Sequence, residues 1–126
     1  MKLSLKTPCT TWTFDELMAC VFGIKVFDVH LYFYLLKHGP FKVNELAEKL
    51  NKNRSTIQRS VQNLMNAGLV YRKQVNLKDG GYFYLYYAVP FEEVKERMKR
   101  EIEGWYKKMK DWIDSIELED LRDLHC

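Results

Sequence analysis

The chain has 126 residues, 47% hydrophobic and 29% charged, which is enough for one globular core and too few for two ordinary domains. Its net charge of +3 is unevenly spread, because residues 37–90 carry nine basic and three acidic side chains while residues 91–126 carry eight basic and eleven acidic ones. The lack of an apolar run of roughly 18 residues, and of a hydrophobic leader in residues 1–13, argues against a membrane span and a secretory signal, so we expect a soluble cytoplasmic protein.

The first part of the chain predicts two helices. Thr13 and Glu16 have the spacing of a capping box, and the apolar residues that follow recur every three or four positions, which predicts a helix over about residues 14–22. Residues 25–37 are apolar on nearly all sides and stop before a Gly-Pro pair. We therefore expect a second helix that is buried by several neighbours.

Two more helices should follow. After a short extended segment, Asn44 is suited to cap a two-turn helix with the sequence ELAEKL. A tight connection then leads to Asn53, which is a good cap for a fourth helix from Arg54 to about Ala67. Gly68 ends that helix at the position where a left-handed residue is wanted.

Beyond the fourth helix, the apolar residues no longer recur about every 3.6 positions, as in a helix, but at every second position, as in a strand. The runs LVYRKQV and YFYLYYAV predict two strands, joined by a turn at residues 76–81 with the sequence NLKDGG. Pro90 opens a last helix of roughly 26 residues, and from Glu117 we expect a frayed or separately folded acidic end. The predicted fold is mainly α with a small β-hairpin (α+β), divided into residues 1–90 and a C-terminal unit of residues 91–126.

The fourth helix carries the candidate binding surface. Ile57, Val61 and Leu64 form its buried stripe, and the outer face that remains is built only from Arg, Ser, Thr and Gln. A solvated face would normally mix charge signs, whereas these side chains can reach base edges: Arg can bond guanine and Gln can bond adenine. Ser and Thr near the helix N-terminus can hold phosphate. Because neutralised phosphates release counterions, the basic centre of the chain also favours a polyanionic partner.

The order of these elements and three sequence blocks resemble the winged helix-turn-helix regulators of the MarR and TrmB type. The blocks are GIKVFDVHLYFYLLKHGP, VNELAEKLNKNRSTIQRSVQNLMNAGLV and YYAVPFEEVKERM, within Gly23–Glu103. The resemblance implies a regulator that binds double-stranded DNA and inserts Arg54–Asn63 into the major groove. On the β-hairpin, or wing, Lys78 would reach the neighbouring minor groove or the backbone, and Arg72 and Lys73 would contact phosphates. The candidate DNA-binding residues are Asn53, Arg54, Ser55, Thr56, Gln58, Arg59, Gln62, Arg72, Lys73 and Lys78.

The last helix predicts a homodimer contact. Its apolar residues step by three or four positions, and its tryptophans are large apolar surfaces that the core of residues 1–90 would struggle to cover. A copy of the helix would cover them, and two recognition helices related by a two-fold axis would read a pseudo-palindromic operator with half-sites roughly 34 Å apart. The alternative is a helix folded back on its own domain. The stripe consists of Phe91, Val94, Met98, Ile102, Trp105, Met109, Trp112 and Ile116.

Several alternatives remain open. The winged helix could serve as a protein-interaction module that reads no sequence, and some of the aromatic residues could line a pocket for a small-molecule effector. Cys9, Cys20 and Cys126 are an odd number of thiols at wide spacings, which predicts reduced cysteines and leaves redox or metal sensing as a further option. The three histidines lack ligand spacing, so we predict no metal site and no cofactor. With no HExxH, GxSxG or glycine-rich phosphate loop, we predict no enzyme.

Overall fold

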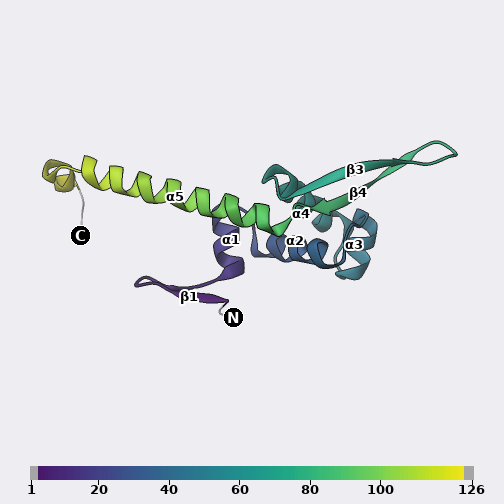
Figure 1. Cartoon of the computed structure of the whole chain (residues 1–126), viewed down its shortest axis with the longest axis horizontal. Coiled ribbons are helices and arrows are strands. Elements are labelled where there is room, and N and C mark those ends of the chain that lie inside the picture. The colour runs from purple at the N-terminus through teal and green to yellow at the C-terminus, as the bar shows by residue number, and fades with distance from the viewer. Residues whose placement is uncertain (1–2, 124–126) are drawn as a thin grey trace.

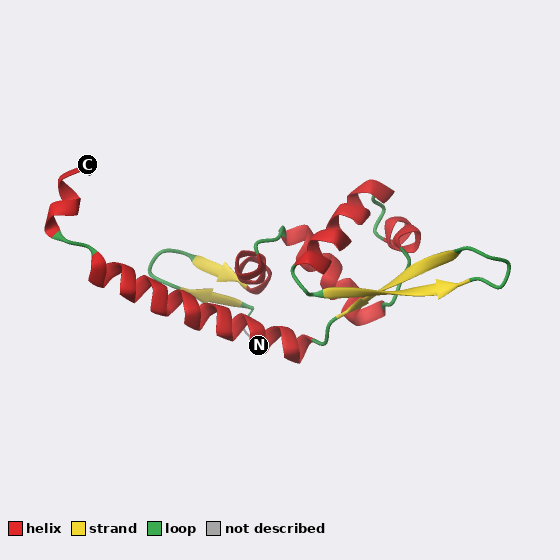
Figure 2. Ribbon diagram, turned by 90° about the horizontal axis from the view of Figure 1, so that it is seen from above, coloured by secondary structure: helices red, strands yellow, loops and turns green. Residues whose placement is uncertain are grey.

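The computed structural model describes residues 3–123, and the side chains of residues 3–121. A helical body lies in the middle of the molecule (Figure 1). A β-hairpin of β3 (Val70–Asn76) and β4 (Tyr82–Ala88) projects from one end of this body, and the helix α5 (Phe91–Ser115) projects from the other end. Figure 2 shows the same opposed projections from above. The body consists of α1 (Phe14–Phe22), α2 (Val26–His38), α3 (Val43–Lys49) and α4 (Arg54–Asn66).

The predicted signals at the helix ends are largely confirmed. Thr13 and Glu16 form the capping box at the start of α1, and the Asn53 side chain accepts the backbone N–H of Thr56 at 2.9 Å at the start of α4. Gly68, which follows α4, has a φ of +74°. This left-handed conformation is costly for residues with a Cβ, so glycine suits the position.

The start of α3 differs from the prediction. The helix begins at Val43 and its N-cap is Lys42, whose backbone N–H donates to Glu45 Oε1 at 2.8 Å. Asn44 therefore lies inside the first turn instead of capping it. Two interactions favour this earlier start. The glutamate accepts the backbone N–H at the cap, and the helical turn buries the Val43 side chain, which is 6% exposed.

An N-terminal hairpin was not predicted. It pairs β1 (Ser4–Lys6) with β2 (Thr11–Thr13) antiparallel, with Ser4 opposite Thr13 and Lys6 opposite Thr11. Each strand has only three residues, which is too short for a period of two to be recognised in the sequence.

The helix α2 lies at the centre of the core, as its apolar sequence predicts. The Tyr32 side chain on this helix is fully buried, and its hydroxyl donates to the Val89 carbonyl oxygen at 2.6 Å. Burial raises the pKa of Tyr32 far above its ordinary value, so the hydroxyl stays a neutral donor. This bond ties α2 to the junction between the wing and α5.

The first turns of α5 pack into the core of the chain's own body. Val94 and Met98 are 0% and 4% exposed, and the Phe91 ring meets Phe14 and Phe33 edge-on, with centroids 5.9 and 6.0 Å away. Phe91, Val94 and Met98, which the sequence assigns to a dimer contact, are therefore covered within a single chain. The C-terminal unit predicted from residue 91 shares its first turns with the core.

The rest of the predicted stripe is open to solvent. Trp112 is 66% exposed and Met109 is 55% exposed, and two apolar side chains that the prediction missed, Tyr106 and Ile113, are 64% and 67% exposed. Trp105 is half-buried. Beyond the helix, Leu118–Asp123 form a separate 3-10 helix, η1. The exposed apolar side chains of α5 and its C-cap are Ile102, Tyr106, Met109, Trp112, Ile113 and Ile116.

In the part of the chain that the structure describes, no individual helix has the length and apolar composition needed to cross a membrane. The helices α1 and α2 meet that test only when they are taken together, as a pair bent by 106°.

Candidate nucleic-acid interface

The two sides of α4 differ as the sequence predicts. Ile57, Val61 and Leu64 are 0% exposed and face the body. The opposite side is open to solvent, and its side chains line a shallow hollow with no acidic residue. The residues that line this hollow are Ser55, Gln58, Arg59 and Gln62. Four of the predicted DNA-binding residues are therefore brought together on one surface.

A buried carboxylate holds α4 against α2, and the sequence analysis missed it. Asp28 is 2% exposed; its Oδ1 accepts the Ser60 hydroxyl at 2.6 Å, and its Oδ2 accepts the Asn63 side-chain amide at 3.2 Å. The backbone N–H of Lys25 also donates to Oδ2, at 3.1 Å. Asn63, at the end of the range predicted to enter the major groove, thus turns inward. The only acid in the apolar run KVFDVHLYF was the signal that could have revealed this anchor.

At the N-terminus of α4, Asn53 acts as a cap. Its Oδ1 accepts both the Thr56 backbone N–H and the Ser55 hydroxyl, each at 2.9 Å. Thr56 is half-buried. Asn53 and Thr56, two members of the predicted set, therefore shape the helix end, while Gln58, Arg59 and Gln62 are exposed further along the helix.

At the C-terminus of α4, a side chain from α5 caps the helix. The Arg97 guanidinium donates to the Ala67 carbonyl oxygen at 2.6 Å and to the Gly68 carbonyl oxygen at 2.7 Å. A cation at this end also complements the helix dipole. The residues that meet are about thirty positions apart in the chain, so no local signal predicted the contact. It links the long helix α5 directly to α4.

The wing presents its two predicted phosphate contacts on opposite faces. Strand residues alternate, so Arg72 shares a face with its partner Tyr86 and with Tyr84, whose ring centroid lies 4.0 Å from the Arg72 guanidinium carbon. Lys73 lies on the other face, with its Nζ 5.0 Å from the Tyr87 ring centroid. A sugar–phosphate strand that runs along one face of the hairpin can therefore be contacted by Arg72 or by Lys73, but not by both.

Lys78 lies in the exposed turn at the tip of the wing, as predicted. The turn is closed by the Leu77 backbone N–H, which donates to the Gly81 carbonyl oxygen at 3.0 Å. Gly80 and Gly81 have φ values of +92° and +82°, so both glycines are required by the backbone here.

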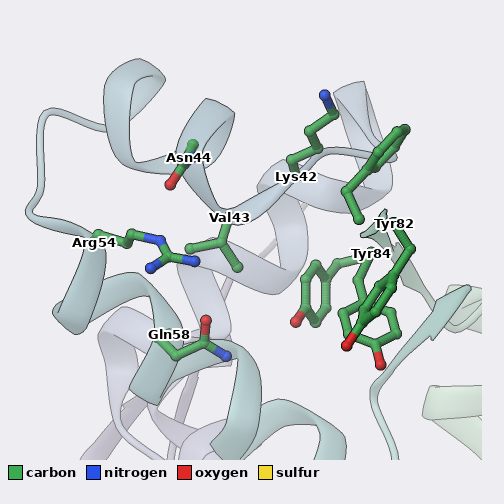
Figure 3. Close-up of a pocket in the computed structure, with 9 residues that line it drawn as sticks. Lys42, Val43, Asn44, Arg54, Gln58, Tyr82 and Tyr84 are labelled. Atoms are coloured by element: carbon green, nitrogen blue, oxygen red, sulfur yellow. The ribbon is translucent and has the colours of Figure 1, made fainter. Parts of the chain in front are cut away.

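A groove separates α4 from the wing (Figure 3). Arg54 and Gln58 reach toward it from α4, Tyr82 and Tyr84 stand on the opposite side, and Val43 lies between them. Its volume is about 300 Å³. Lys42, at the rim, holds its Nζ 4.0 Å from the Phe83 ring centroid. The other lining residues are Asn44 and Tyr86, so the lining contains two cations and no carboxylate.

The cysteines and histidines form no recognisable site in residues 3–121. Cys9 and Cys20 are exposed, and Cys126 lies outside the described residues. His30 Nε2 lies 2.8 Å from Asp15 Oδ2 on the surface between α1 and α2. Within that part of the chain, no group of three or more His, Cys, Asp or Glu side chains could hold a metal ion.

Comparisons with known proteins agree with this geometry. A family model described as "Sugar-specific transcriptional regulator TrmB" matches residues 18–92, which include α2 to α4 and the wing. Two relatives come from Methanocaldococcus jannaschii. The uncharacterized protein MJ1503 is 65% identical over 120 residues, covering 95% of this chain and 91% of the relative. The uncharacterized protein MJ1082 is 37% identical over 102 residues, covering 81% and 84%.

Solved structures share the fold. A possible transcriptional regulator from Methanosarcina mazei Go1 matches with a TM-score of 0.81 and 21% identity, covering 90% of this chain and 97% of that one. A mutant of S. aureus MepR, bound to an oligodeoxyribonucleotide, matches with a TM-score of 0.51 and 14% identity, covering 86% and 77%. Together with the observed hairpin and helices, these matches confirm the predicted winged helix-turn-helix fold with a long C-terminal helix.

Proposed function

The chain belongs to the TrmB family of transcriptional regulators, and from that premise we propose that it is a sequence-specific double-stranded DNA-binding regulator that acts as a homodimeric repressor. The outer face of α4 carries the proposal. It exposes Arg59 among Ser55, Gln58 and Gln62 without an acid, while Asp28 fixes the opposite side of the same helix. Such donors and acceptors on a helix that fits the major groove are suited to reading base edges.

The exposed part of α5 supports the dimer. From Ile102 to Ile116 the apolar residues step by 3, 4, 3 and 4 positions, through Trp105, Met109 and Trp112, which is the heptad spacing of a coiled coil. An exposed apolar stripe of this size is costly in water, and a second copy would cover it. A two-fold dimer would present two α4 helices to a pseudo-palindromic operator, and its bulk would occlude the promoter.

The fold of the neighbours adds support. The MepR mutant with the same fold was solved with an oligodeoxyribonucleotide. The sugar specificity in the family description is not part of the proposal, because no described feature of this chain indicates a sugar site.

Binding to duplexes selected from a random pool tests the proposal. We expect the wild-type protein to enrich a pseudo-palindromic sequence and to lose affinity steeply with salt. Arg59→Ala should weaken binding to the enriched duplex by about tenfold or more and weaken binding to a scrambled duplex less, because a bidentate base contact is lost. Arg100→Ala, which removes the same charge from the exposed surface of α5, is the matched control and should change neither affinity.

Two results would overturn the proposal. One is a wild-type protein that retains no duplex at low salt, which would favour a protein-interaction module instead. The other is an Arg54→Ala/Arg59→Ala double variant that binds the enriched duplex as tightly as the wild type, which would remove α4 as the reading element.

A further inference from the structure

We propose that the groove between α4 and the wing holds one sugar–phosphate strand of the duplex, with Arg54 and the hydroxyls of Tyr82 and Tyr84 as donors to a backbone phosphate. This inference rests on the proposed function, since it names a contact of the same DNA-binding surface. Neither tyrosine belongs to the set that the sequence predicted.

The geometry of B-form DNA requires a strand at this place. A major groove and the adjacent minor groove are separated by one sugar–phosphate backbone. If α4 enters the major groove and the wing tip with Lys78 reaches the adjacent minor groove, that backbone must pass between α4 and the wing. The groove lined by Arg54, Tyr82 and Tyr84 is the space between these two elements (Figure 3).

The lining has the chemistry that a phosphodiester needs. Arg54 takes part in none of the ion pairs found in residues 3–121, so its guanidinium is available for an anion. No carboxylate lines the groove to repel a phosphate. Tyrosine adds a hydroxyl donor and a flat ring against which a deoxyribose can pack.

The wing orients these tyrosines. Tyr82 and Tyr84 lie opposite Asn76 and Gln74 in the hairpin, and therefore on the face that also carries Arg72. The Arg72 guanidinium lies over the Tyr84 ring at 4.0 Å, which makes Arg72 a positioning residue for this contact. Lys73, on the reverse face, should make no contact with the strand in the groove.

The test couples a change in the protein to a change in the DNA. Duplexes carrying the selected operator are prepared with a neutral methylphosphonate at each backbone position in turn, and their affinities are measured for the wild type, Arg54→Gln, Tyr84→Phe and Lys73→Gln. For the wild type, several positions should weaken binding, and at the position that faces the groove, one per half-site, the loss should be about tenfold, as expected for a charge-assisted hydrogen bond. At that position the loss should be nearly abolished in Arg54→Gln and reduced in Tyr84→Phe, which keeps the guanidinium contact, while Lys73→Gln should still lose the full factor.

The outcomes separate this inference from the proposed function. If the wild type selects an operator and Arg59→Ala weakens it, but no phosphate is coupled to Arg54 or Tyr84, the groove contact is wrong and the regulator remains. The groove contact is equally wrong if Lys73→Gln shows the coupling instead. If the wild type binds no duplex, the proposed function fails first. Melting temperatures of all variants identify any loss that is due to unfolding.

Discussion

At the scale of single residues, one buried carboxylate helps to fix how α4 is rotated about its axis. Asp28 accepts the Ser60 hydroxyl and the Asn63 amide, and both donors come from the inner side of α4. A buried carboxylate is tolerated only when such donors satisfy it. Because residues 60 and 63 point at α2, residues 55, 58, 59 and 62 must point outward.

Replacing Ser60 by Ala should destabilise the protein by about 1.5–3 kcal/mol, the usual contribution of a hydrogen bond to a charged buried group. Urea unfolding followed by circular dichroism measures this change. Gln58→Ala, on the exposed side of the same helix, is the control and should lie within about 0.5 kcal/mol of the wild type. Equal stability of Ser60→Ala and the wild type would show that the bond contributes nothing.

The sequence predicts the exposed and the apolar face of α4 but not the polar contacts that hold the helix in place, for a physical reason. Polarity along a helix is a local pattern, so the exposed face around Arg59 can be recognised from spacing alone. The partners of Asp28 are 32 and 35 positions away, and Arg97 reaches Ala67 across 30 positions. Contacts of this kind depend on how the helices pack against one another. The spacing of apolar residues along the sequence gives no information on that packing.

At the scale of elements, the start of α1 responds to pH through its cap. The Thr13 hydroxyl lies 2.5 Å from Asp15 Oδ1 and 2.6 Å from Glu16 Oε1. Hydrogen bonding to Thr13, and for Asp15 also to His30, lowers the pKa of both carboxyls. Groups with lowered pKa values stabilise the folded state above their ordinary pKa, and that stabilisation is lost as the pH falls through the lowered value.

Thr13→Ala should therefore reduce the melting temperature by a few degrees at neutral pH, and the difference from the wild type should shrink below about pH 4 as the carboxylates are protonated. Thermal melts at a series of pH values measure this. Thr11→Ala, on the exposed strand β2, should give a difference that does not vary with pH. A constant Thr13→Ala difference between neutral and acid pH would contradict the assignment.

The elements were predicted well where their signals are strong, and missed where they are short. The capping residues Thr13 and Asn53 and the turn before Gly81 predicted α1, α4 and the wing closely. The three-residue strands of the N-terminal hairpin have no period to detect. The helix α3 starts earlier than predicted because the Glu45 carboxylate accepts the backbone N–H of Lys42. This bond makes Lys42 the cap in place of Asn44.

At the scale of the whole molecule, α5 changes role along its length. Its apolar residues step by 3, 4 and 4 from Phe91 to Ile102, close to the period of a straight helix, and this part packs on the chain's own core. From Ile102 the steps become the alternating 3 and 4 of a heptad, and this part is exposed. The change of spacing at Ile102 can be read from the sequence, but only the structure shows that the apolar residues before it are covered by the chain's own core.

This division predicts that dimerisation, and through it the tight binding of a full operator by two α4 helices, depends on the exposed part of α5. Trp112→Glu places a charge on the heptad stripe and should give a monomer in sedimentation equilibrium. Lys107→Glu changes the charge by two units on the opposite side of the helix, at position f of the preceding heptad, and should leave the dimer intact. In fluorescence anisotropy titrations, the wild type should bind a full operator about 10²–10⁴ times more tightly than a single half-site, because the second α4 binds without a further loss of translational freedom.

The Trp112→Glu monomer should bind the full operator and the half-site almost equally, since each molecule brings only one α4. Its half-site affinity should match that of the wild type, because the wing and α4 lie away from the C-terminal end of α5, where the substitution is made (Figure 1). A monomeric variant that keeps the preference for the full operator would mean that the two half-sites are joined by contacts other than α5. A variant that remains a dimer would move the dimer contact away from this helix.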